Sequence, residues 1–176
     1  MRLLVASLIL LAPAWQASAT KPALQPRTIE GRQLSIVTSQ SAMSAAPGAR
    51  VSLFVDVMPR PKMHVYAPEQ TGEYIRITLD LDDNRAFRTR KTIFPKASDY
   101  YFAPLEQTFK VFAKPFRIRQ DLTLAESAAL RRRASAGGPL AITGTLRYQA
   151  CDDEVCYRPQ DIKVAWTLAL KARMHE

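Results

Sequence analysis

The sequence predicts an all-β protein, a two-sheet antiparallel sandwich that is immunoglobulin-like in general architecture and carries one short helix. Three observations lead to this prediction. Seven or eight short segments show the alternation of apolar and polar residues that is typical of half-buried strands. Turn-forming residues separate these segments, and neither an internal repeat nor the strand–helix alternation of a parallel sheet is present. The length of 176 residues suits one domain with a substantial core.

The first 19 residues have the features of an export signal. Arg2 supplies a positive start, an apolar stretch of about ten residues follows, and Ala17-Ser18-Ala19 matches the small-residue pattern of a signal-peptidase site. The apolar stretch is too short to span a bilayer. We therefore expect cleavage after about Ala19 and a periplasmic mature protein without a membrane span. A retained N-terminal anchor is the alternative.

A domain is expected over residues 33–172, preceded by a flexible leader at 20–32 that is rich in proline and polar side chains. The clearest strand is 50–58, where four apolar residues alternate with polar ones. Pro115 falls inside another apolar segment and suits an edge strand or a bulge. In chain order, the expected strands are 34–38, 50–58, 75–81, 87–94, 109–118, 140–148 and 162–170.

Residues 123–134 are the one segment predicted to be helical. Thr123 and Glu126 have the spacing of a capping box, and Gly137-Gly138 would end the helix. The basic run 131–133 within it is expected on a solvated face, with steering of an acidic partner or a membrane surface as the alternative. Nucleic-acid binding is not expected despite the net charge of +9, because the aromatic residues are not interleaved with a Lys/Arg stripe.

The chain contains two cysteines, Cys151 and Cys156, in the segment YQACDDEVCYRP. A strand ending at Tyr148 followed by a chain reversal over 152–155 would place them opposite each other. Their Cα atoms could then lie within the roughly 4.4–6.8 Å that a disulfide requires. An exported protein meets an oxidising compartment, so thiol–disulfide exchange is the expected chemistry.

A purely structural disulfide is the main alternative to an exchanging one. Closing a loop of about six residues stabilises a fold by only ~2 kcal/mol, against ~4.7 kcal/mol for a hundred-residue loop, and this favours exchange over reinforcement. Structural zinc requires four ligands, and only His64 and His175 could join the two thiols. No metal or cofactor is therefore expected. A cysteine protease is disfavoured because no nucleophile segment of that kind is visible.

Three acidic residues, Asp152, Asp153 and Glu154, separate the cysteines. Negative charge beside a sulfur disfavours the thiolate. The pair is therefore expected to be attacked by a partner, or to be activated when a partner docks. The alternative is that these acids only decorate an exposed turn.

Two segments resemble a known family. GTLRYQACDDEVCYRP (144–159) resembles the active-site hairpin of the N-terminal periplasmic domain of the thiol:disulfide interchange protein DsbD, and KMHVYAPE (62–69) resembles the early tyrosine-bearing strand of that domain. The likeness extends over about 33–169. It implies an immunoglobulin-like fold whose cysteine pair takes electrons from a thioredoxin-like domain and passes them to oxidised periplasmic proteins.

The resemblance also implies roles for individual residues. Cys156 would form the mixed disulfide with partners, and Cys151 would resolve it. His64 and Tyr66 fall where the family has two tyrosines beside the active site, so His64 is a departure from the family pattern. The connector between the cysteines is one residue shorter than the commonest form in the family.

The family further has an aromatic shield over the disulfide. Within 99–102, the resemblance implies that Tyr101 or Phe102 provides this shield, with ordinary packing as the alternative for each. Tyr148 and Tyr157 flank the cysteine pair and complete the expected surroundings of the site.

The DsbD family joins this domain to a membrane electron carrier and a thioredoxin-like domain. Separate thioredoxin-like periplasmic proteins, or a membrane thiol carrier, are therefore the expected partners here. The leading hypothesis is an electron relay and not a substrate-transforming enzyme. The alternatives are a secreted sandwich that binds a protein or ligand, and a module that delivers a metal.

Overall fold

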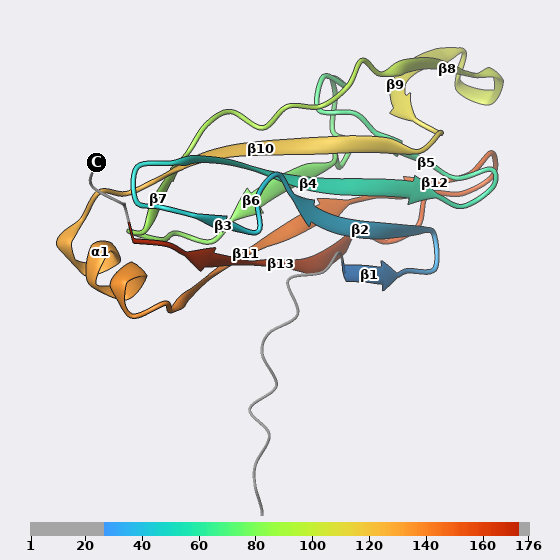
Figure 1. Cartoon of the computed structure of the whole chain (residues 1–176). Helices are drawn as coiled ribbons and strands as arrows, with labels where there is room; N and C mark the ends of the chain where they lie inside the picture. Colours follow the sequence, from blue (N-terminus) through green and yellow to red (C-terminus); the bar gives the residue numbers. More distant parts are fainter. Residues whose placement is uncertain (1–26, 173–176) are drawn as a thin grey trace, which may run out of the picture.

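Two β-sheets pack face to face, and a third sheet lies at one end of the sandwich, opposite the end that carries the helix (Figure 1). The computed structural model describes residues 27–172. The first sheet has the strand order β1-β2-β4-β10-β7. Its strands are β1 (Arg27–Glu30), β2 (Leu34–Gln40), β4 (Arg50–Pro59), β10 (Phe116–Leu124) and β7 (Phe87–Thr89).

The second sheet has the order β3-β13-β11-β6. All pairings between the strands of the fold are antiparallel except that of β3 with β13. The strands of this sheet are β3 (Ser44–Ala45), β13 (Gln160–Leu170), β11 (Pro139–Tyr148) and β6 (Thr78–Leu81). The prediction of an all-β sandwich with one short helix is confirmed.

The third sheet has the order β12-β5-β9-β8 and positions the cysteines. A short 3-10 helix, η1 (Ala103–Leu105), joins β8 to β9. The strands of this sheet are β12 (Ala150–Cys151), β5 (His64–Tyr66), β9 (Gln107–Phe112) and β8 (Ser98–Phe102).

The alternating strands bury their apolar faces between the two large sheets, as the sequence pattern predicts. In β4, Val51, Leu53, Val55 and Val57 are almost completely buried, and the residues between them are partly exposed. The same alternation holds along β13. The indole N–H of Trp166, a buried residue of that strand, donates a hydrogen bond to the Ser39 carbonyl over 2.9 Å. The two sheets are therefore joined by a polar contact as well as by packing.

Four segments differ from the sequence expectation in their strands, and the first is the strand expected over 75–81, which is limited to 78–81. Residues 27–30, expected in the leader, form β1 because they pair antiparallel with β2. The strand expected over 87–94 is limited to 87–89, and beyond it Ile93 forms an isolated bridge with Arg119 of β10. The segment 109–118 is divided between β9 and β10, which belong to different sheets, because Pro115 has no N–H to continue a ladder.

The helix begins later than the capping box predicts. Thr123 lies in β10, where it pairs with Arg50 of β4 and with Arg88 of β7, so its backbone is held extended. The helix α1 (Ala128–Ser135) is capped by Ser127, whose hydroxyl accepts a hydrogen bond from the Leu130 N–H over 3.2 Å. Pairing on both sides of β10 therefore overrides the local capping signal.

Candidate functional site

The strand that leads to the cysteines changes sheets just before it reaches them. β11 pairs with β13 as far as Tyr148. Two residues later β12 pairs instead with β5 of the third sheet, and Cys151 lies opposite His64. At the junction, the Gln149 side chain donates a hydrogen bond to the Tyr157 carbonyl over 3.0 Å. This change of sheet places the cysteines beside the third sheet.

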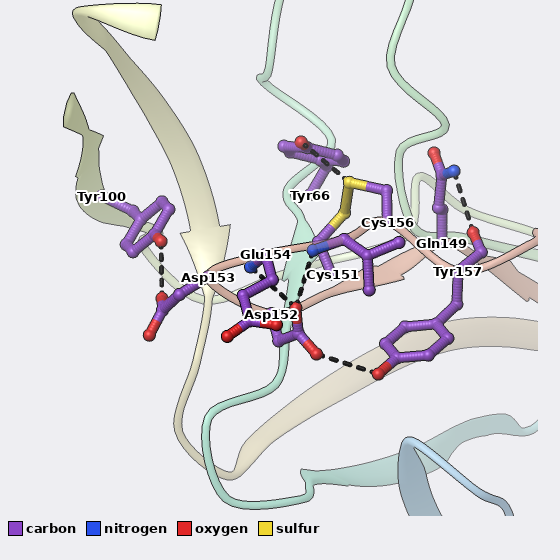
Figure 2. Close-up of a disulfide and its surroundings, with 10 residues drawn as sticks. Tyr66, Tyr100, Gln149, Cys151, Asp152, Asp153, Glu154, Cys156 and Tyr157 are labelled. Carbon is purple, nitrogen blue, oxygen red and sulfur yellow. Dashed lines mark hydrogen bonds between the residues drawn. A yellow bond between two sulfur atoms is a disulfide. The ribbon is translucent and has the colours of Figure 1, made fainter. Parts of the chain in front are cut away.

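Cys151 and Cys156 form a disulfide across the tight turn that follows β12 (Figure 2). They lie opposite each other as an antiparallel pair, with their Cα atoms 4.0 Å apart, slightly closer than the sequence led us to expect. The two cysteines differ greatly in exposure to solvent, since Cys151 is only 2% exposed and Cys156 is exposed. Solvent therefore reaches Cys156 but hardly reaches Cys151.

Asp152 organises the turn between the cysteines. Its Oδ1 accepts hydrogen bonds from the backbone N–H groups of Glu154, at 2.9 Å, and Val155, at 2.8 Å. Its Oδ2 accepts a third bond from the Tyr157 hydroxyl at 2.8 Å (Figure 2). The bonds from Glu154, Val155 and Tyr157 hold the pKa of Asp152 below its usual value. The carboxylate therefore has a definite local role in addition to its charge.

Tyr100 links β8 to the same turn. Its hydroxyl donates a hydrogen bond to Asp153 Oδ1 over 2.7 Å (Figure 2). The pKa of Tyr100 is raised to about 12, mainly by this bond and to a smaller extent by partial burial. The Tyr100 ring packs on His64 with 4.5 Å between ring centroids, and Phe102 stacks on Tyr100 with 6.4 Å between ring centroids. The strand β8 therefore forms an aromatic cover beside the disulfide.

Tyr66 brings a second aromatic group to the sulfurs. Its hydroxyl lies 3.7 Å from Cys156 Sγ (Figure 2). Its ring packs against Tyr74 and Phe109, with centroid separations of 4.8 and 5.7 Å. Burial raises the pKa of Tyr66, with a smaller contribution from Tyr74. The phenol is therefore protonated at neutral pH and can donate a hydrogen bond to a thiolate at Cys156.

His64 is buried at the same place, 3% exposed. Burial lowers the pKa of His64 because it penalises the charged imidazolium, although the nearby Asp153 and Asp152 act in the opposite direction. The imidazole is therefore neutral at neutral pH. His64 therefore places a group that can take up a proton next to Cys151.

The structure brings together five of the residues singled out from the sequence. They are Cys151, Cys156, His64, Tyr66 and Phe102. Tyr157 joins them through its bond to Asp152. Tyr148, in contrast, is 1% exposed and belongs to the main core of the sandwich, and Tyr101 is 62% exposed on the face of β8 opposite to Tyr100 and Phe102.

Three aromatic residues that pack around Tyr66 and Cys151 were not singled out from the sequence. They are Tyr74, Tyr100 and Phe109. Alternation along β8 could have identified Tyr100, since residues two apart in a strand share a face and Phe102 was already a candidate. Tyr74 lies outside the strands, and no sequence pattern places it against Tyr66.

Within residues 27–172, no group of three or more His, Cys, Asp or Glu side chains is arranged to hold a metal ion. His175, one of the four ligands considered for zinc, lies outside the described residues, as does the expected cleavage point after Ala19. In the described part of the chain, no helix has the length and apolar character required to span a bilayer.

Comparisons with known proteins give a match to one protein family and likenesses to solved structures. The family model for the N-terminal region of the thiol:disulfide interchange protein DsbD matches residues 33–167. Among solved structures, the N-terminal periplasmic domain of ScsB from Proteus mirabilis is similar, with a TM-score of 0.54 and 12% identity. That match covers 81% of this chain, which spans 50% of the ScsB structure. The GAE domain of yeast GGA1 aligns with a TM-score of 0.42 and 8% identity, over 80% of this chain and 98% of that one. No curated protein sequence gives a significant match.

Proposed function

Because the chain belongs to the family of DsbD N-terminal domains, we propose that it exchanges its Cys151–Cys156 disulfide with the thiols of thioredoxin-like proteins in the bacterial periplasm. The observation that carries this proposal is the unequal exposure of the two cysteines: Cys156 is exposed and Cys151 is buried. Exchange requires a sulfur that a partner can reach, and burial of the second sulfur directs the attack to Cys156. The export signal predicted from the sequence supports the periplasmic location.

Reduction of the disulfide begins when a partner thiolate attacks Cys156 Sγ. A bond forms between the partner sulfur and Cys156, the Cys151–Cys156 bond breaks, and Cys151 leaves as a thiolate that takes up a proton. A second thiol of the partner then attacks the partner sulfur of the mixed disulfide and releases Cys156. The partner ends as a disulfide, and this chain ends as a dithiol that carries two electrons.

Delivery of the electrons follows the reverse order. The Cys156 thiolate attacks the disulfide of an oxidised client and forms a mixed disulfide. Cys151 then attacks Cys156 Sγ, which restores the intramolecular disulfide and releases the client with both sulfurs reduced. Tyr66 is well placed to favour the Cys156 thiolate because its hydroxyl lies 3.7 Å from the sulfur.

A trapping experiment tests this function. The Cys151→Ala variant keeps the exposed cysteine but lacks this chain's own resolving thiol, so its mixed disulfides with thioredoxin-like proteins should last longer and accumulate in periplasmic extracts. Cys156→Ala is the matched control: its remaining thiol is buried, and it should trap far less. If the Cys151→Ala variant stays monomeric on non-reducing gels, the exchange function is refuted.

The alternative function is a binding module whose disulfide is only structural. The reduction potential distinguishes the two, because structural disulfides lie below about −300 mV and exchangeable ones lie higher. We expect the Cys151–Cys156 pair to lie above this limit. Equilibration of the purified protein with glutathione or dithiothreitol buffers gives the value, and a lower potential would support the binding module.

A further inference from the structure

His64 is the direct cross-strand neighbour of the buried cysteine. In the pairing of β5 with β12, the Cα atom of His64 lies opposite that of Cys151. Residues directly opposite in an antiparallel pair point to the same face, with their Cβ atoms about 4.5–5.5 Å apart. Both residues are almost completely buried, at 3% and 2% exposure. The imidazole and the Cys151 side chain therefore share one buried environment.

The groups around His64 hold its ring in place. Tyr100 of β8 covers the ring at a centroid distance of 4.5 Å, and Tyr66 contacts it edge-on at 6.1 Å. Asp153 and Asp152 of the turn act on it electrostatically. Both carboxylates are engaged elsewhere, because Asp153 accepts the Tyr100 hydroxyl and Asp152 accepts the Tyr157 hydroxyl and two backbone N–H groups.

The resolving step requires a proton acceptor at this position. When a partner is bound to Cys156, Cys151 carries a thiol, and only its thiolate can attack. A buried thiol beside carboxylates loses its proton reluctantly, since burial and like charge both disfavour the anion. Of the titratable groups at the site, the neutral imidazole of His64 can accept a proton near neutral pH.

We propose that His64 takes the proton from the Cys151 thiol when this cysteine resolves the mixed disulfide, an inference that rests on the exchange function proposed above. The neutral imidazole becomes an imidazolium as Cys151 becomes a thiolate. The thiolate attacks Cys156 Sγ, the Cys151–Cys156 bond forms, and the bond from Cys156 to the partner sulfur breaks. The electron pair leaves on the partner sulfur, which takes up a proton, and loss of the proton from His64 returns the ring to its neutral form. In the opposite direction, His64 first takes up a proton from solvent and then passes it to Cys151 as this cysteine departs.

The reaction of the reduced protein with 5,5′-dithiobis(2-nitrobenzoate) separates the two steps. Attack by Cys156 releases a first coloured thiolate and leaves a mixed disulfide, and attack by Cys151 then releases a second. In the His64→Phe variant, which keeps a ring for Tyr100 to cover, we expect the first release to be unchanged. The second should slow at neutral pH by on the order of 100-fold, the lower end of what a positioned base contributes.

The pH profile of the second release distinguishes proton transfer from packing. In His64→Phe, the rate should rise with pH until the Cys151 thiol ionises unaided and should then converge with the wild-type rate. A purely structural defect would slow the reaction at every pH. The His64→Gln variant provides a second test, since an amide is polar but takes up no proton in this range, and it should be as slow as His64→Phe. A normal second release in either variant would overturn the proposal.

A measurement on the unaltered protein guards against a variant that fails to fold. If His64 and Cys151 share a proton, the imidazole signals in NMR spectra should titrate differently in the reduced and the oxidised protein, because only the reduced Cys151 ionises beside them. Identical titration curves would refute the proposal while leaving the exchange function intact. Absence of the second release from the wild-type protein would instead remove the resolving role of Cys151 and with it the proposed function.

Discussion

The Tyr100 hydroxyl donates a hydrogen bond to Asp153 Oδ1 over 2.7 Å, and this bond ties β8 to the turn between the two cysteines. The same ring covers His64, which lies opposite Cys151 in the neighbouring strand pair. One tyrosine therefore contacts both the acidic turn and His64, the cross-strand neighbour of the buried cysteine. Access to the sulfurs should depend on how firmly β8 is held.

The Tyr100→Phe variant tests this dependence. It removes the bond to Asp153 but keeps the ring, so the turn should open more often, and dithiothreitol should reduce the disulfide several-fold faster, as expected when access limits the exchange. The loss of one partly exposed hydrogen bond should lower the free energy of unfolding by less than about 1 kcal/mol. Tyr101→Phe is the matched control, because Tyr101 is exposed on the opposite face of β8. Equal reduction rates for the two variants would show that β8 does not control access.

The ionisation of Tyr100 should report the same bond. Because its pKa is raised from 10.0 to about 12, its contribution to stability is fully present below pH 10 and is lost as the pH rises through about 12. Titration followed by tyrosinate absorbance should therefore show a late-ionising phenol that is absent from Tyr100→Phe. A difference spectrum between the two proteins that develops near pH 10 would contradict the bond.

Much of this site follows from the sequence, because its main features are local. The two cysteines are five residues apart, so their pairing needs no contact between distant segments. Tyr66 lies 90 residues from Cys156, but it belongs to a short segment whose family resemblance could be recognised. The alternation within β4 and β13 likewise reports which face is buried, and both strands lie where that pattern predicts. Local spacing and alternation were sufficient for these elements.

The features that the sequence does not predict depend on contacts between distant segments. The change of sheet at Gln149 arises because Ala150 and Cys151 find partners in β5, more than eighty residues earlier. Tyr100 reaches Asp153 only because β9 holds β8 at that side of the third sheet. The late start of the helix has the same kind of cause, since Thr123 is retained by two neighbouring strands.

Substitutions of Asp152 should separate its charge from its role in the turn. Asp152→Asn removes the charge but keeps an oxygen that can accept the N–H groups of Glu154 and Val155. Less negative charge favours the thiolates and hence the reduced form, so the reduction potential should become less negative by about 10–30 mV. Asp152→Ala loses the turn bonds as well, and its disulfide should also form more slowly after reduction. If Asp152→Asn leaves the potential unchanged, the acidic turn does not tune the sulfurs.

The lowered pKa of Asp152 in the folded protein also predicts how acid changes the contribution of this residue to stability. Because this pKa is lowered, the contribution of Asp152 to stability is present above its unfolded value of 3.8 and is lost as the pH falls through the folded value. The difference between wild type and Asp152→Ala in urea unfolding should therefore shrink on acidification below pH 3.8. A difference that grows in acid would exclude the ionised carboxylate as its cause.

The stability of the reduced protein should decide whether the disulfide serves mainly as reinforcement. The disulfide closes a short loop between residues five apart, so its removal should lower the free energy of unfolding by about 2 kcal/mol and leave the domain folded. Urea unfolding of the wild-type protein with and without reductant measures this difference without creating a cavity at the buried Cys151, and an unchanged slope would show that the same two states are compared. The folded and unfolded forms of the oxidised and reduced protein make a thermodynamic cycle, so folding stabilises the disulfide by the same amount. The reduction potential of the folded pair is then only about 45 mV more negative than that of the pair in the unfolded chain. So small a contribution from the fold keeps the pair open to exchange, whereas collapse of the domain on reduction would mean that the disulfide is a structural support.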